Sequence, residues 1–207
     1  MTLHTVVYHP ELYKLLELAN QHIEERTILD CGAGGEKPPL GLFHIHGYKT
    51  TGIDISSSQI EASRVFEKEH GVDLNIIEGD MLDLQFPDES FSCVYSFHSS
   101  IHLTKKQTKQ AINEMLRVLK PGGIMYVDFI WESGQQMYLG EERAPGEYWM
   151  TGRNGKMVVH TVFSEEEADE FFEGHQVLLK RKEQLSFDRN VEVLEDAYIH
   201  YYIKKKG

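Results

Sequence analysis

The chain has 207 residues, of which 41% are hydrophobic and 26% are charged, a composition typical of one globular domain that buries its own core. The formal net charge of −12 repels a phosphate backbone, so we expect no nucleic-acid partner. The sequence contains no apolar run of about 18 residues, the length that predicts a membrane-spanning helix.

The first five residues lack a basic region followed by an apolar one, so the sequence predicts no secretory signal. Cys31 and Cys93 are the two cysteines of the sequence, and in a chain without an export signal we expect both to be reduced thiols. These features together predict a cytoplasmic protein.

Helical and extended patterns alternate along the first 130 residues. The expected helices cover residues 10–19, 60–70 and about 105–119, and one more begins around residues 38–39. The expected strands lie near residues 26–30, 50–55, 74–78, 91–96 and 124–129. Strands that alternate with helices in this way predict a parallel sheet covered on both faces.

The alternation ends after residue 130. Residues 131–160 are rich in Gly, Met, Tyr and Trp and show no clear period, so we expect an insertion over the active-site edge. Ser164 precedes three glutamates, which predicts a capping box and a short acidic helix. Residues 177–187 and 193–204 are expected to form an antiparallel pair of strands. We therefore expect a single domain over residues 1–207 with an insertion at about 131–160.

A glycine-rich turn follows the first strand. The apolar residues 27–29 lead to Asp30, and the turn contains Gly32, Gly34 and Gly35. Glycines let a chain turn sharply and let a ligand approach the main chain closely. Asp54 ends the second strand, 20 residues beyond Gly34, which is the spacing that brings a carboxylate to ribose hydroxyls. The pattern predicts an adenosine-containing cofactor.

The turn does not complete the dinucleotide motif Gly-x-Gly-x-x-Gly. Lys37 occupies the third glycine position, where a pyrophosphate needs a close approach of the following helix. This departure argues against an NAD-dependent oxidoreductase, which remains one alternative function.

Five blocks follow one another between residues 25 and 130, at residues 29–35, 52–56, 78–84, 86–92 and 117–123. In order and spacing they resemble the small-molecule branch of the class I S-adenosylmethionine-dependent methyltransferases. The resemblance implies an α/β, Rossmann-like three-layer sandwich with a mostly parallel seven-stranded sheet and a C-terminal antiparallel strand. It also implies S-adenosyl-L-methionine as the cofactor and a small molecule as the methyl acceptor.

By this resemblance, Asp30 and the backbone of Gly32, Ala33 and Gly34 surround the methionine part of the cofactor. Asp54 accepts hydrogen bonds from the two ribose hydroxyls. Asp30 can also be interpreted as a helix cap, although the glycine turn beside it favours the ligand role.

The resemblance places the adenine ring between Ile55 and Met81, with Asp80 accepting from its exocyclic amine. Ser96, at the end of the fourth strand, presents its carbonyl group to the methionine ammonium. Taken alone, Met81 is more often a core residue than a ligand contact.

His98 is the candidate general base or substrate contact, because it follows the fourth strand near the cofactor end of the sheet. A hydrogen-bonded loop histidine is the competing interpretation, and the nearby His102 is expected to have mainly packing duties. No metal is expected.

Aromatic and methionine side chains of the insertion form either a lid over the acceptor or the core beneath the insertion. They are Trp131, Met137, Tyr138, Tyr148, Trp149 and Met150. The function predicted is methyl transfer by a monomer or homodimer with no membrane partner. A non-catalytic module that binds S-adenosylmethionine or S-adenosylhomocysteine is the second alternative, because methyl transfer has no obligatory catalytic residue.

Overall fold

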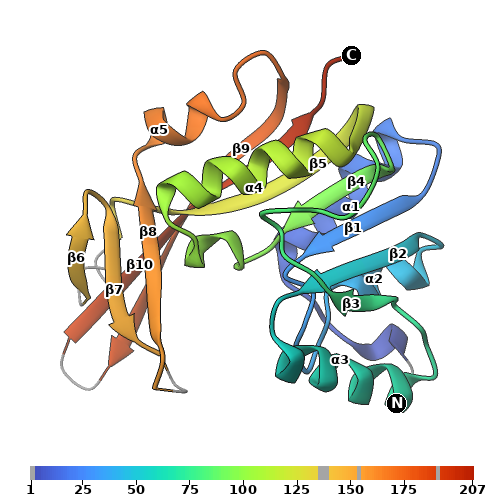
Figure 1. Ribbon diagram of the computed structural model, residues 1–207, viewed down its shortest axis with the longest axis horizontal. Helices are drawn as coiled ribbons and strands as arrows, with labels where there is room; N and C mark the ends of the chain where they lie inside the picture. Colours follow the sequence, from blue (N-terminus) through green and yellow to red (C-terminus); the bar gives the residue numbers. More distant parts are fainter. Residues whose placement is uncertain (1–2, 135–139, 153–154, 190–191) are drawn as a thin grey trace.

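The computed structural model describes residues 3–134, 140–152, 155–189 and 192–207. Its central sheet has the order β3-β2-β1-β4-β5-β10-β9 (Figure 1). These strands are β1 (Thr27–Cys31), β2 (Lys49–Asp54), β3 (Ile76–Glu78), β4 (Phe91–Ser96), β5 (Leu119–Trp131), β9 (Gln176–Arg189) and β10 (Glu192–Lys204).

The pairs from β3 to β5 are parallel, whereas β10 runs antiparallel to both β5 and β9. The predicted mixed α/β fold, with a mostly parallel sheet and antiparallel strands towards the C-terminal side, is confirmed.

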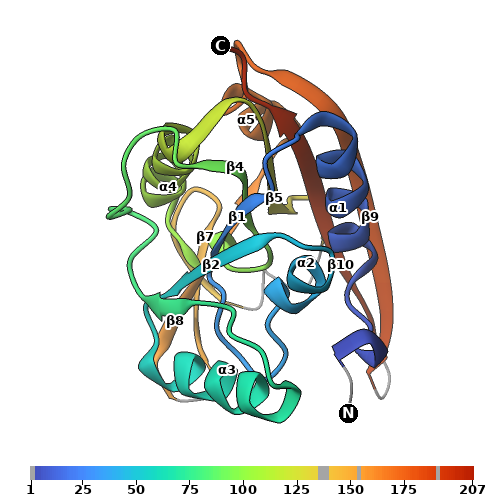
Figure 2. The same cartoon turned by 90° about the vertical axis from the view of Figure 1, so that its right-hand side faces the viewer.

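Helices cover both faces of the sheet (Figures 1 and 2). They are α1 (Pro10–His22), α2 (Leu40–Ile45), α3 (Ser57–His70), α4 (Lys105–Val118) and α5 (Glu165–Glu170), with the short 3-10 helices η1 (Leu3–Thr5) and η2 (Ser100–His102). Along β1 the side chains alternate, so that Ile28 joins the core under α1 and α2, and Leu29 joins the core under α4 and α5. Three layers result. No helix in the described ranges is long and apolar enough to span a membrane.

The predicted start of the fifth strand differs from the structure. The fifth strand begins at Leu119, directly after α4, so Pro121, Gly122 and Gly123 lie within its first half. Gly122 has a positive φ of 76°, and its N–H bonds the carbonyl of Lys205, while the pairing of β4 with β5 shifts register before Cys93. A glycine in this conformation lets the strand kink locally. The hydrogen bond to Lys205, just after β10, holds the kink in place.

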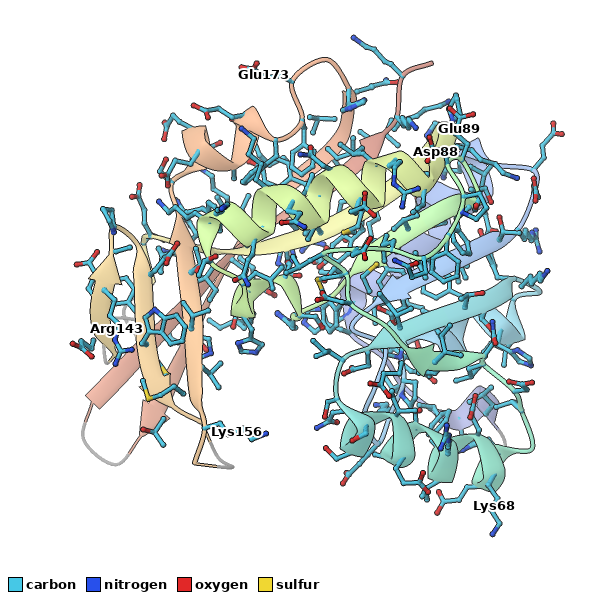
Figure 3. The ribbon with its side chains drawn as sticks, in the orientation of Figure 1. Lys68, Asp88, Glu89, Arg143, Lys156 and Glu173 are labelled. Carbon is cyan, nitrogen blue, oxygen red and sulfur yellow. The ribbon has the colours of Figure 1, made fainter. Side chains whose placement is uncertain are left out.

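The predicted insertion forms three strands, β6 (Glu141–Ala144), β7 (Glu147–Thr151) and β8 (Met157–Phe163). They pair antiparallel with one another, and the end of β8 pairs parallel with Ile130 and Trp131 of β5. Charged side chains such as Arg143 on β6, Lys68 on α3 and Glu173 after α5 project from the outside of the molecule (Figure 3).

Candidate functional site

A cavity of about 360 Å³ opens at the carboxyl ends of the parallel strands. Its lining comes from the segments that follow β1, β2, β3 and β4, and from the start of α4. The strand order reverses between β1 and β4, and open α/β sheets bind ligands outside such a reversal. The lining residues are Gly32, Ile53, Asp54, Ile55, Gly79, Asp80, Met81, Leu82, Ser99, His102, Leu103 and Gln107.

The glycine turn packs tightly against its neighbours. Gly32 has a φ of +104°, and a Cβ there would come within 2.2 Å of the Ser99 hydroxyl. The N–H groups of Gly32 and Ala33 both donate to the carbonyl of Ile53, each at 2.9 Å. These two amides are therefore already bonded, and the turn presents its bare Cα surface to the cavity.

Asp54 is fixed in the cavity wall by two backbone amides. Its Oδ2 accepts from the Gly34 N–H at 2.9 Å and its Oδ1 from the Ser56 N–H at 2.8 Å. A side chain at Gly34 would collide with this carboxylate, at 2.6 Å from Oδ2. Each carboxylate oxygen keeps a second lone pair for a ligand hydroxyl.

An apolar rim continues the cavity beyond Asp54. Ile55 is 73% exposed, which is unusual for a large apolar side chain, and it lines the same cavity as Met81. Asp80 accepts from the Leu82 N–H at 2.9 Å, which bends the chain after β3 around the rim. Such a rim suits a flat apolar group with polar edges.

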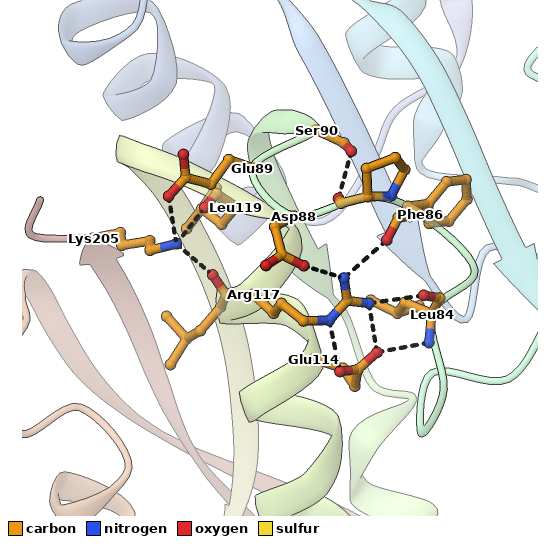
Figure 4. Close-up of polar contacts among 11 residues, drawn as sticks. Leu84, Phe86, Asp88, Glu89, Ser90, Glu114, Arg117, Leu119 and Lys205 are labelled. Carbon is orange, nitrogen blue, oxygen red and sulfur yellow. Dashed lines mark hydrogen bonds and ion pairs between the residues drawn. The ribbon is translucent and has the colours of Figure 1, made fainter.

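Arg117 of α4 holds the loop that carries this rim (Figure 4). Its guanidinium donates to the carbonyls of Leu84 and Phe86, at 2.8 and 2.9 Å, and pairs with Asp88 and Glu114. Glu114 also accepts from the Leu84 N–H at 2.9 Å. The side chains of one helical turn thus determine where residues 79–90 lie.

Three buried polar groups lie around the start of the glycine turn. Asp30 Oδ2 and the hydroxyls of Tyr95 and Tyr8 make no hydrogen bond of normal geometry among the described residues, although the Tyr95 hydroxyl lies close enough to Asp30 to interact with its carboxyl group. Burial raises the pKa of Asp30 to about 8, with the Tyr95 hydroxyl opposing the shift and the charge of Asp54 adding to it. Burial also raises the pKa of Tyr95, and both Asp30 and Tyr8 contribute. The set would accommodate a cationic, hydrogen-bond-donating group.

His98 lies beside the cavity on the segment after β4. It has a left-handed φ of 51°, and its N–H donates to Asp128 Oδ1 at 2.9 Å. Its Nδ1 lies 2.7 Å from Asp128 Oδ2, and the Asp128 side chain is fully buried. Burial lowers the pKa of His98, but the hydrogen bond and the charge of Asp128 outweigh it, and the net shift is upward.

The structure brings five of the predicted site residues into the cavity lining: Gly32, Asp54, Ile55, Asp80 and Met81. Asp30, Ala33, Gly34, Ser96 and His98 are not in the lining. Ser96 is fully buried, and its hydroxyl accepts from the Ser100 N–H at 3.2 Å.

Sequence reasoning missed Tyr8, Tyr95, Ser99 and Asp128. One of these had a signal in the sequence, because Asp128 is an acid within the apolar run of β5. Tyr95 comes beside Asp30 only through the parallel register of β1 and β4. Ser99 and Tyr8 are placed at the site by tertiary packing, which no local sequence pattern predicts.

His102 lines the cavity, and its Nδ1 lies 3.4 Å from the carbonyl of Val159 on β8. Tyr148 packs against the small core of Ile101, Ile130 and Val162, and Trp131 packs against the larger core under α4. Met137 and Tyr138 lie outside the described residues.

Comparison with known proteins shows which proteins the chain is similar to. Residues 29–127 match the family of methyltransferase domains. The sterol 24-C-methyltransferase of Pneumocystis carinii is 32% identical over 112 residues, which cover 52% of this chain and 28% of that protein. An O-methyltransferase of Aspergillus sclerotiorum is 32% identical over 111 residues, which cover 53% of this chain and 39% of that protein. The chain thus spans less than half the length of these curated relatives.

Solved structures share the fold over nearly the whole chain. A methyltransferase of Methanosarcina mazei described as S-adenosylmethionine-dependent has a TM-score of 0.73 at 20% identity, covering 97% of this chain and 99% of that one. The 1,6-didemethyltoxoflavin N1-methyltransferase of Burkholderia thailandensis, solved with S-adenosylhomocysteine, has a TM-score of 0.60 at 12% identity, covering 96% and 79%. The chain thus has the fold of these methyltransferases, and its residues 29–127 match a methyltransferase domain.

Proposed function

We propose that the protein binds S-adenosyl-L-methionine in this cavity and transfers its methyl group to a small molecule. The observation that carries the proposal is the buried Asp30 carboxyl, whose Oδ2 makes no hydrogen bond of normal geometry among the described residues. Asp30 lies two residues before Gly32 of the lining, close enough to Asp54 for charge on one to affect the other. A ligand with an ammonium group at one end and vicinal hydroxyls further along satisfies both carboxyls.

Different residues would hold different parts of the cofactor. Asp30, the turn from Gly32 to Gly34 and the Ser96 carbonyl would hold the methionine part. Asp54 would accept from the ribose hydroxyls. The adenine would lie between Ile55 and Met81, with its amine towards Asp80. The exposed face of Ile55 is consistent with this role, because a ligand ring would remove it from water.

When bound, the cofactor supplies a methyl group on a sulfonium, which is a reactive leaving group. The protein's contribution is then to orient the acceptor and exclude water, and good orientation can supply ~7–11 kcal/mol of the barrier. His98 is our candidate base or substrate contact at this stage. The strands β6 to β8 would enclose the acceptor, since His102 of the lining packs against β8.

The acceptor class follows from the relatives. The names of the similar proteins specify a sterol carbon in one case and an oxygen in another. A sterol is a small molecule, and the charge of −12 disfavours a nucleic acid. We also propose a cytoplasmic location, supported by two buried free thiols, Cys31 and Cys93, and a monomeric or homodimeric state.

Calorimetric titration with S-adenosylhomocysteine tests the cofactor. We expect saturable binding with one site per chain and no binding of NAD. Heat from NAD alone, or none from S-adenosylhomocysteine with folded protein, contradicts the proposal.

Transfer is tested separately, with methyl-labelled cofactor and a cell metabolite extract. Label should appear in a small-molecule product. If the cofactor binds and no acceptor becomes labelled, the chain acts as a non-catalytic binding module.

A further inference from the structure

We propose that Asp128 is a positioning residue for His98, that His98 acts through Nε2 as the general base, and that the acceptor is an aromatic hydroxyl compound. The inference rests on the proposed methyl transfer and specifies its acceptor. It is carried by the geometry at the ends of β4 and β5.

The Asp128 carboxylate fixes His98 at two points. Oδ1 accepts from the backbone N–H and Oδ2 lies 2.7 Å from the ring nitrogen Nδ1. The backbone of His98 has a φ of 51°, which non-glycine residues adopt only where the surroundings hold them there. One carboxylate therefore sets both the main chain and the ring, which is more than a loop histidine needs for packing.

This contact also determines the tautomer. A carboxylate can only accept, so neutral His98 must carry its proton on Nδ1 and leave the lone pair on Nε2. Asp128 is fully buried, whereas the His98 side chain is 31% exposed. Asp128 occupies the Nδ1 edge of the ring, so a base at His98 must reach its proton through Nε2.

The surroundings of His98 suit a flat acceptor. The ring centroids of Phe97, Tyr198 and His9 lie 4.1, 4.8 and 5.9 Å from that of His98. Aromatic walls of this kind favour an aromatic ligand.

The proton balance then follows. The hydroxyl of the acceptor gives its proton to His98 Nε2, and its oxygen forms a bond to the methyl carbon of the sulfonium donor. The carbon–sulfur bond breaks and its electron pair stays on sulfur, leaving a neutral thioether, a methyl ether and a protonated imidazole. An alkene carbon has no proton to give before it attacks, so with a sterol side chain this pair would take no part in the methyl-transfer step, and a base would be needed only afterwards, to remove a proton from the carbocation.

The decisive variant is Asp128→Asn. The amide oxygen can still accept from the His98 N–H, but the amide nitrogen would face Nδ1 and turn it into an acceptor, moving the proton to Nε2. Nitrogen-15 NMR of the ring reads the tautomer without any acceptor. We expect Nδ1–H in the wild type and Nε2–H in the variant, and an Nε2–H wild type overturns the proposal.

A pH titration of the same NMR signals measures the pKa of His98. The charged or titratable groups that face His98 are Asp128 on β5, Glu183 on β9, Asp196 and His200 on β10, His102 on η2, Tyr198 and His9. The pKa of His98 should fall in Asp128→Asn, because burial then outweighs the remaining charges. An unchanged pKa contradicts the positioning role.

Activity is measured with catechol, hydroquinone and 4-nitrophenol as probes, and with an alkene-bearing sterol. We expect the wild type to methylate at least one phenol on oxygen, and both His98→Gln and Asp128→Asn to lower kcat by about 100-fold or more. The control His22→Gln, an exposed histidine at the end of α1, should change nothing.

Binding of S-adenosylhomocysteine distinguishes a failure of the proposed methyl transfer from a failure of the proposed acceptor. It should stay within about twofold in all three variants, and its absence from the wild type refutes methyl transfer itself. Normal binding with methylation of the sterol alone, or of no phenol, overturns the hydroxyl acceptor. If Asp128→Asn does not fold, His98→Gln and the wild-type tautomer decide the question.

Discussion

We expect Asp30 to be mostly protonated at pH 7 in the empty protein, because burial raises its pKa to about 8. Ionisation of a carboxyl in an apolar interior has a large unfavourable desolvation free energy. An ammonium ligand reverses this, since it stabilises the carboxylate that burial disfavours. The cofactor proposed here should therefore change the protonation state of the protein as it binds.

We predict that at pH 7 binding of S-adenosylhomocysteine releases about one proton per site. Below the raised pKa the empty site is neutral and the bound site is ionised, so the association constant rises with pH, close to tenfold per unit between pH 6 and 7. Calorimetry in buffers of different ionisation enthalpy measures this release. Asp30→Asn, which resembles the neutral carboxyl, should fold, bind weakly and show no pH slope; a slope that persists assigns the proton to another group.

Asp54 has a structural and a ligand-binding side. Asp54→Asn keeps one acceptor for a backbone amide but loses the charge. We expect the affinity for S-adenosylhomocysteine to fall by roughly 10- to 100-fold, as for a lost charge-assisted hydrogen bond of ~1.5–3 kcal/mol, with a smaller effect on the melting temperature. The control is Asp83→Asn, in the turn that directly follows the cavity-lining residues of the loop after β3. Equal affinities in both variants would remove Asp54 from the ribose role.

At this scale the sequence indicated residues that act through local chain geometry. Asp54 and the glycine turn were recognisable because a βαβ unit fixes their spacing. The contacts of Asp54 were not recognisable from the sequence. Ser56, two residues later, makes no side-chain cap, and the Ser56 N–H donates to the Asp54 carboxylate instead. Asp128 meets His98 only through the pairing of two strands and a left-handed backbone, neither of which a local pattern specifies.

Among the elements, the loop of residues 79–90 links the cavity to α4. It contains no regular structure after β3 and depends on the Arg117 side chain for three of its contacts, with a fourth made by Glu114. The position of Met81 and Asp80 at the rim thus depends on a side chain that does not line the cavity.

Arg117→Ala should therefore affect both stability and binding. We expect the free energy of unfolding to fall by about 1–3 kcal/mol and the affinity for S-adenosylhomocysteine to weaken several-fold. Arg64→Ala, an exposed arginine on α3 with one ion pair, is the matched control and should cost less than about 0.5 kcal/mol. Denaturant melts and calorimetry of the two variants decide, and equal losses contradict a special role for Arg117.

Elements with strong local signals were predicted well. The capping boxes at Thr104 and Ser164 set the starts of α4 and α5, and Gly71 ends α3 with a left-handed φ. The strands β6 to β8 had no recognisable period, because β6 is mostly exposed, β7 is half-buried along most of its length and the end of β8 is buried on both faces. Their pairing with one another, and that of the end of β8 with β5, makes them strands.

For the molecule as a whole, the first long helix is joined to the last strand. Glu11 of α1 is 1% exposed, accepts a hydrogen bond from the Tyr202 hydroxyl of β10 and pairs with Arg181 of β9 at 2.8 Å. Figure 2 shows α1 lying along these strands. The contact closes the core beneath α1.

We predict that Glu11→Ala lowers the free energy of unfolding by about 1–3 kcal/mol, because the buried Tyr202 hydroxyl loses its carboxylate partner. Arg181 is partly exposed and regains water. Glu17→Ala on the same helix removes only a surface pair with Lys14 and serves as the control. Thermal melts compare the two, and a cost for Glu11→Ala no larger than that of the control refutes the prediction.

The link between Glu11 and Tyr202 bridges a separation of 191 residues. On a ribosome that adds ~5–20 residues per second, α1 would wait about 10–40 seconds for β10 to emerge. During that interval its apolar face has no final partner, and a nascent chain is open to chaperones or to wrong pairings. The order of synthesis thus makes the arrival of β10 the step that closes the core beneath α1.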